Sequence, residues 1–147
     1  MMEERSEITV LVITQRNINE LYKLHLYPKL TSLICVRLGL NFLPNLPETL
    51  TKLWCSNNRL TTLPLLPDGL IELDCSHNQL TALPPLPNKL NCLWCNDNKL
   101  TIIPPLPNKL TQLWCYNNQL IYLPILHDAL TDLWCSDKRL IFSTRFA

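Results

Sequence analysis

The feature that most constrains this chain is a 20-residue pattern that runs through most of its length. Residues 50–69 read LTKLWCSNNRLTTLPLLPDG, and the pattern restarts at 70, 90, 110 and 130, with a weaker copy at 30. The shared template is L-x-x-L-x-C-x-x-N-x-L-x-x-L-P-x-L-P-x-x. A short fixed period indicates that each copy is one structural unit and that the units stack.

The spacing inside a copy predicts how the backbone runs. Apolar residues occupy positions 1, 4, 6, 11, 14 and 17. Positions 4 and 6 are two apart, as on one face of a strand, so position 5 should face the other way. We predict strands at positions 3–6 that pair in parallel, about 4.8 Å apart. They should lie near residues 33–36, 53–56, 73–76, 93–96, 113–116 and 133–136. Prolines at positions 15 and 18 predict extended return legs with little helix.

The 147 residues suit one domain. We expect a divergent N-terminal repeat or cap over 1–29, six repeats over 30–141, and a short tail over 142–147 without a C-terminal cap. An uncovered last coil would present a free strand edge, through which two chains could associate. A short helix over 17–25 is the alternative for the N-terminal segment. The divergent repeat would be two residues longer than the others and would place these residues in the core: Ile8, Leu11, Ile13, Ile18, Leu21 and Leu24.

Position 9 carries Asn58, Asn78, Asn98 and Asn118, and changes to Leu38 and Lys138 in the end copies. An asparagine amide has two donors and two acceptor lone pairs, so a stacked column can satisfy backbone groups that a bend leaves unpaired. The pattern therefore predicts an asparagine column inside the solenoid.

Position 6 carries a cysteine in every copy from 30 to 130. A spacing of 20 without close ligand pairs is not a zinc pattern, so we interpret this column as small buried apolar side chains. Cys92 and Cys95 form a C-x-x-C, but their odd separation places them on opposite faces. Seven reduced thiols indicate a reducing compartment such as a cytoplasm.

Position 5 places aromatic side chains on the outer face of the strands. Four tryptophans and one aspartate in one file predict a contact surface, although indoles that pack on one another as a structural ladder would give the same pattern. We call the position-5 residues the strand-face strip: Trp54, Asp74, Trp94, Trp114 and Trp134. Neighbouring positions complete the predicted partner-binding set: Lys52, Glu72, Gln112 and Asp132 at position 3, Tyr116 at position 7, and His77 and Asp97 at position 8.

Composition argues against other classes of function. The formal net charge is +1, which gives no electrostatic reason for a nucleic-acid or membrane partner. No apolar run is long enough to span a membrane, and the acidic N-terminus does not resemble a signal peptide. The three histidines, His25, His77 and His127, fall at unrelated template positions. We expect no catalytic set, no cofactor and no metal site.

The LPxLP return leg and the 20-residue period resemble the shortest class of leucine-rich repeats, typical of secreted bacterial effectors. Similar arrays with cysteine at position 6 occur in giant DNA viruses and intracellular bacteria. This resemblance covers residues 30–141. It implies a right-handed solenoid, of the α/β class by convention and in practice mostly β, whose parallel sheet forms a concave face that binds proteins. Some effector relatives carry a ubiquitin-ligase domain after the repeats, with a C-x-D catalytic motif. Cys135-Ser136-Asp137 has the C-x-D form, but it lies inside a repeat with its cysteine in the core column. We therefore treat it as a coincidence and do not transfer that activity.

These features together predict a non-enzymatic module that binds a protein or peptide through a Trp-rich, mildly acidic face. If the effector or viral resemblance holds, the partner would be a host protein and the compartment the host cytoplasm. One alternative is a structural protein that self-assembles through its open ends. Another is recognition of a glycan by aromatic stacking.

Overall fold

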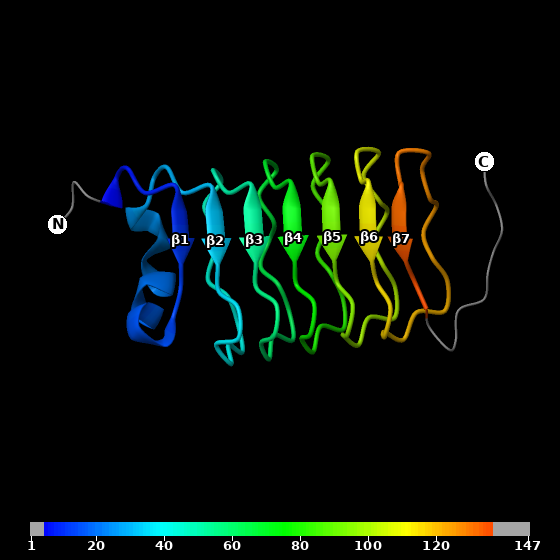
Figure 1. The fold of residues 1–147 in the computed structure, drawn as a ribbon, viewed down its shortest axis with the longest axis horizontal. Coiled ribbons are helices and arrows are strands. Elements are labelled where there is room, and N and C mark those ends of the chain that lie inside the picture. Colours follow the sequence, from blue (N-terminus) through cyan, green and yellow to red (C-terminus); the bar gives the residue numbers. More distant parts are fainter. Residues whose placement is uncertain (1–4, 137–147) are drawn as a thin grey trace.

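The computed structural model describes residues 5–136, which form one parallel sheet of seven strands in chain order (Figure 1). Each turn of the chain adds one strand to the sheet and then returns behind it, so the molecule is a solenoid that is mostly β with little helix. This confirms the predicted fold. The strands are β1 Val10–Val12, β2 Ser32–Ile34, β3 Lys52–Trp54, β4 Glu72–Asp74, β5 Cys92–Trp94, β6 Gln112–Trp114 and β7 Asp132–Trp134.

The sequence period is also the register of the sheet. Leu33 pairs with Leu53, and Leu53 pairs with Leu73, so partner residues occupy the same template position in neighbouring coils. The first coil is two residues longer than the others, so that Val10 lies opposite Ser32. Identical positions therefore form columns that run along the solenoid.

The strands occupy template positions 3–5, so they end one position before the predicted span of 3–6; β2, for example, is Ser32–Ile34 instead of a strand near 33–36. The chain then bends at position 8, where the backbone adopts the left-handed conformation, with φ of 57° at Asn57 and 54° at Asp97. Asparagine, aspartate and histidine tolerate this conformation better than most residues. Pairing still extends past the strand end, since the Cys55 N–H donates to the Asp74 carbonyl at 2.7 Å.

The core lies between the strands and the return legs. The middle residue of every strand from β2 to β6 is a fully buried leucine, and the leucines at position 1 of each copy from 30 to 90 are buried as completely. The return legs are extended, and each ends in a tight turn: the Leu70 N–H donates to the Pro67 carbonyl at 3.0 Å, and Leu90 repeats this with Pro87. Proline supplies an acceptor there without needing a partner for a donor.

The N-terminal coil combines features of both conformations considered for residues 1–29. Its strand β1 pairs with β2, but its return leg is the 3₁₀ helix η1, Gln15–Leu26, which is longer than the predicted helix (Figure 1). No proline lies within η1, and Pro28 follows its end. The Asn17 side chain accepts a hydrogen bond from the Thr14 N–H at 2.6 Å and donates to the Val12 carbonyl at 3.0 Å, which joins the helix start to the strand end.

The asparagines at position 9 connect each coil to the one before it. The Asn98 Nδ2 donates to the carbonyls of Cys95 and Asn96 in its own coil and of Cys75 in the preceding coil, at 3.0–3.2 Å. Its Oδ1 accepts from the Leu80 N–H at 2.9 Å. The remaining three position-9 asparagines repeat this arrangement: Asn58, Asn78 and Asn118. Lys138 and the tail over 142–147 lie outside the described residues.

The cysteine column is buried in five coils. Cys35, Cys55, Cys75, Cys95 and Cys115 are fully buried, whereas Cys92 and Cys135 are half-buried, and none of the seven forms a disulfide. Burial raises the pKa of the Cys35 thiol to about 12 and holds the pKa of the Cys55 and Cys95 thiols well above the usual range. The column therefore consists of neutral thiols that pack as small apolar groups.

We expect Asn98→Ala to destabilise the fold by about 1–3 kcal/mol for each buried group that it leaves unpaired. The groups at risk are three carbonyls and one N–H in two adjacent coils. The measurement is the free energy of unfolding in urea. The control is Asn88→Ala, which removes the same amide from an exposed position in a return leg. Equal stability of the two variants would contradict a structural role for the column.

We expect Cys92 and Cys135 to react with a thiol reagent before the five column cysteines do, because reactivity follows exposure and thiolate formation. Burial, followed by the nearby Glu72 carboxylate, raises the pKa of the Cys92 thiol. Its thiolate fraction at pH 7.5 should be lower than that of a free cysteine and should increase with pH. Mass spectrometry after timed labelling at pH 7.5 and 9 measures this, with Cys92→Ser as control. Fast labelling of the column at pH 7.5 would contradict its burial.

Candidate functional site

The strand-face strip crosses five of the seven strands, with the last residue of each strand from β3 to β7. In register, Trp54 pairs with Asp74, Asp74 with Trp94, and Trp94 with Trp114, which in turn pairs with Trp134. Trp134 is 60% exposed and Trp54 37%, whereas Trp94 and Trp114 are half-buried. The strip therefore presents less free indole surface than four outward tryptophans suggest.

The lost exposure comes from contacts between the indoles themselves. Ring centroids lie 6.0 Å apart between Trp94 and Trp114, at 62° to each other, and 6.0 Å apart between Trp114 and Trp134, at 51°. The Trp114 indole N–H also donates to the Asp132 carboxylate at 3.2 Å. Tilted aromatic pairs of this kind stabilise a structure beyond the area that they bury. These three indoles form one continuous stack.

Asp74 interrupts the strip between Trp54 and the stack. One oxygen of its carboxylate accepts hydrogen bonds from the Ser76 hydroxyl at 2.6 Å and the Ser76 N–H at 3.1 Å. The Asp74 side chain thus bonds to its own chain two residues further on, whereas the other four strip residues are tryptophans. The strip consequently has a gap at β4.

Most charged groups around the strip are paired with neighbours. Lys52 Nζ lies 2.7 Å from the Glu72 carboxylate, and His77 lies 3.6 Å from Asp97. Asp97 also accepts hydrogen bonds from Asn96 and Asn117 at 2.7 and 2.9 Å. Burial tends to raise the pKa of the Asp97 carboxyl, but these two hydrogen bonds and the nearby His77 lower it overall. Asp97 is therefore a fixed negative charge at neutral pH.

A hollow of about 340 Å³ opens on this face where the strip is interrupted. It crosses the ends of β4, β5 and β6, and its residues occupy template positions 5, 7 and 8. We call it the Asp74 trough, and it is lined by Asp74, Ser76, His77, Trp94, Asn96, Trp114 and Tyr116. Five of these were predicted from the sequence as partner-binding residues, whereas Ser76 and Asn96 were not.

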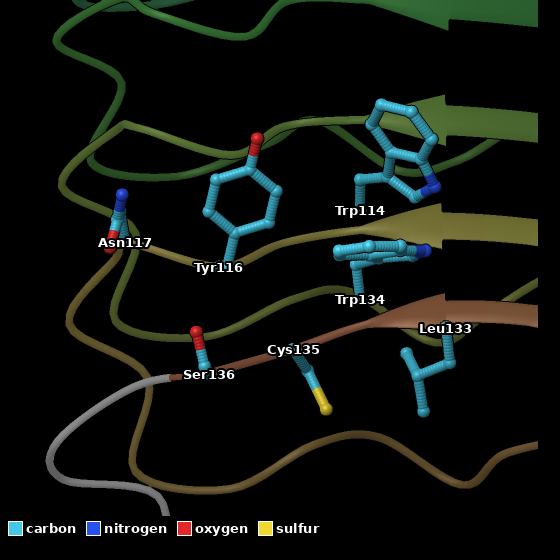
Figure 2. Close-up of a pocket in the computed structure, with 7 residues that line it drawn as sticks. All are labelled: Trp114, Tyr116, Asn117, Leu133, Trp134, Cys135 and Ser136. Atoms are coloured by element: carbon cyan, nitrogen blue, oxygen red, sulfur yellow. The ribbon is translucent and has the colours of Figure 1, made fainter.

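A second hollow, of about 540 Å³, lies at the last described strand and is shown in Figure 2. Trp134 and Ser136 extend to the same side of the chain as Trp114 and Tyr116, whereas Leu133 and Cys135 point to the opposite side. Alternate residues of β7 therefore face opposite ways, as the strand period requires. Gln112 and Asp132, also predicted for the site, lie side by side in register at position 3.

The structure adds apolar residues at the N-terminal end of the sheet that the sequence reasoning missed. Val10 and Val12 of β1 are 53% and 49% exposed, and Ile34 of β2 lies between Val12 and Trp54 in register. The alignment that buries Leu11 and Ile13 already implies that their neighbours face outward. The apolar part of this face therefore continues beyond Trp54 to the first strand.

Residues 5–136 hold no cluster of three or more histidine, cysteine or carboxylate side chains suited to a metal ion. Within the same range, no helix combines the length and the apolar character needed to cross a membrane. The indole N–H of Trp94 is buried and lacks a hydrogen-bond acceptor in this part of the chain.

Comparison with known proteins supports the repeat assignment. A family model described as leucine-rich repeats (2 copies) matches residues 48–88 and 68–108. Among solved structures, YopM from Yersinia enterocolitica WA-314 is 38% identical with a TM-score of 0.73, over 74% of this chain. The leucine-rich repeat domain of a Shigella effector is 34% identical with a TM-score of 0.75, over 81% of this chain. No curated protein matches.

The matched region is only part of each of those proteins. It spans 24% of the YopM chain and 54% of the Shigella chain. Over the matched region, both share the fold described above. The 20-residue period, the seven-stranded parallel sheet and these matches together show that the chain is a leucine-rich repeat protein of the short, bacterial-effector-like class.

Proposed function

We propose that this chain is a non-enzymatic module that binds a partner protein or peptide through the strand-face strip and the residues beside it. The observation that carries the proposal is the face itself. It presents a file of apolar side chains, interrupted by one carboxylate and hollowed beside it. Interfaces between proteins are enriched in tryptophan and tyrosine, and their strongest contributions come from such residues next to well-packed pockets.

The packing of the three-indole stack favours this function. Trp94, Trp114 and Trp134 support one another, so little side-chain entropy remains to be lost when a partner binds. A rigid aromatic surface is suited to recognition for that reason. Self-packing and binding are therefore compatible roles for the same three residues.

The class of partner follows from the charges beside the strip. Glu72, Asp74, Asp97 and Asp132 outnumber the single lysine, Lys52, so the face suits a partner with basic and apolar side chains and disfavours nucleic-acid phosphates. The two effector neighbours suggest a protein of the host cell as partner. We place the chain in a reducing compartment, such as the host cytoplasm, because it carries seven free thiols.

We expect the Trp94→Ala/Trp114→Ala double variant to lose partner proteins that the wild type captures, at least tenfold in yield, since truncated aromatic anchors commonly cost about 2 kcal/mol or more. Quantitative mass spectrometry after affinity capture from host-cell lysate measures this. The matched control is Ile102→Ala/Tyr122→Ala, which removes two exposed apolar side chains from the return legs.

Stability must be measured on the same variants. Trp114 makes two ring contacts and one hydrogen bond, but it fills no core position, so Trp114→Ala should destabilise the fold less than Asn98→Ala. If Trp114→Ala were less stable than Asn98→Ala and still captured its partners, the strip would be a structural element and not a binding surface. Mass that rises with concentration and falls in the double variant would favour self-assembly. Capture of glycans and of no protein would favour sugar recognition.

A further inference from the structure

The Asp74 trough combines residues of different chemistry from three neighbouring strands. Asp74, Ser76 and His77 come from the end of β4, and Trp114 and Tyr116 from the end of β6. Trp94 and the buried Asn96 come from β5, which lies between them. One carboxylate and three aromatic side chains thus line the same hollow. A volume near 340 Å³ is at the small end for ligand sites, which suits a single side chain better than a whole element.

Asp74 differs from the other acids of this face in its partners. Glu72 has an ion pair with Lys52, Asp97 is held by two asparagines and His77, and Asp132 accepts from Trp114. Within residues 5–136, no cation lies within ion-pair distance of the Asp74 carboxylate, and its two hydrogen bonds from Ser76 both end on Oδ1. Its Oδ2 is therefore left to accept a donor from outside the chain.

The indoles provide the second requirement for a cation. An indole face carries negative electrostatic potential and attracts a guanidinium or ammonium group positioned over it. Trp94 and Trp114 are fixed by their mutual contact at 6.0 Å, and both line the trough. The free carboxylate oxygen, the two indoles and the Tyr116 hydroxyl all favour a planar, positively charged donor group.

From this arrangement we propose that the Asp74 trough binds an arginine side chain of the partner. The proposal rests on the proposed function and specifies its chemistry. Arginine fits better than lysine because its guanidinium is planar, stacks on aromatic rings and is weakly hydrated. It can donate to the Asp74 carboxylate while its plane lies along an indole, whereas an ammonium group keeps more of its hydration shell. Asp74 would then act as a specificity-determining residue, and the indoles as its platform.

The test uses nuclear magnetic resonance of the indole N–H groups in the full chain. The four tryptophan signals are assigned with single Trp→Phe variants. Three small probes are then titrated: the N-acetyl amides of arginine, of lysine and of citrulline, which has the shape of arginine without its charge. We expect saturable shifts of the Trp94 and Trp114 signals with the arginine probe, and at least tenfold weaker binding of the other two.

Asp74→Asn removes the charge and keeps the shape and the acceptor for Ser76. We expect it to weaken binding of the arginine probe about tenfold, as for loss of a charge-assisted hydrogen bond. The matched control is Asp68→Asn, which makes the same change in net charge at an exposed turn away from the trough. Dispersed indole signals in both variants verify that they are folded. Equal binding of the citrulline or lysine probe, or unchanged binding by Asp74→Asn, would overturn the proposal.

Affinity capture then separates this proposal from the one on which it depends. Partner capture that is lost in Trp94→Ala/Trp114→Ala and kept in Asp74→Asn would leave the strand face as a protein-binding surface and reject the arginine site. Capture kept in all three variants would reject the strand face itself. Capture lost with Asp74→Asn and kept with Asp68→Asn, together with the probe titration, would support both.

Discussion

The hydrogen bonds between neighbouring coils are the interaction on which the rest of this structure depends. No coil can satisfy its own backbone, because a three-residue strand and an extended return leg contain few internal hydrogen bonds. Each coil therefore pairs with the next one through its strand, through the N–H of position 6, and through the asparagine at position 9. Stability in such a stack is a sum over neighbours, so one broken bridge weakens two coils. The buried leucines add apolar area and pair with one another in register, and the polar bridges join each coil to its neighbour.

Much of this could be predicted from the sequence because the register is the period. Once copies stack 20 residues apart, the columns of leucine, cysteine and asparagine follow from position alone. The left-handed backbone after each strand was not predicted because the residues at position 8 vary in type, with Arg37 and His77 beside asparagine and aspartate. Only the backbone angles reveal what those residues share. The return leg of the divergent first copy could form the helix η1 because no proline lies within Gln15–Leu26, whereas prolines keep the other return legs out of a helix.

The outward orientation of the strip residues could be predicted from the sequence, but their conformation could not. Alternation along a strand determines that Trp114 faces outward, and it determines nothing about whether the indole lies against Trp94 or stands free in solvent. Those choices depend on rotamers and on partners such as Asp132, whose place beside Trp114 requires the sheet to be built first. The same limit explains why Ser76 and Asn96 were not predicted as residues of the site. They occupy positions that vary from coil to coil, and only the gap at Asp74 makes them line a trough.

That gap suggests where specificity arises in a repeat protein of this kind. A surface of identical coils is periodic, so it binds a ligand equally well in several registers and has no preferred position. One departure from the template removes that degeneracy. Asp74 is such a departure, because it replaces an indole within the strip and separates Trp54 and the valines of β1 from the three-indole stack. If the strip binds a partner as proposed, a partner that contacts both apolar segments would have to place a compatible group opposite the carboxylate, and this requirement would fix its register on the solenoid.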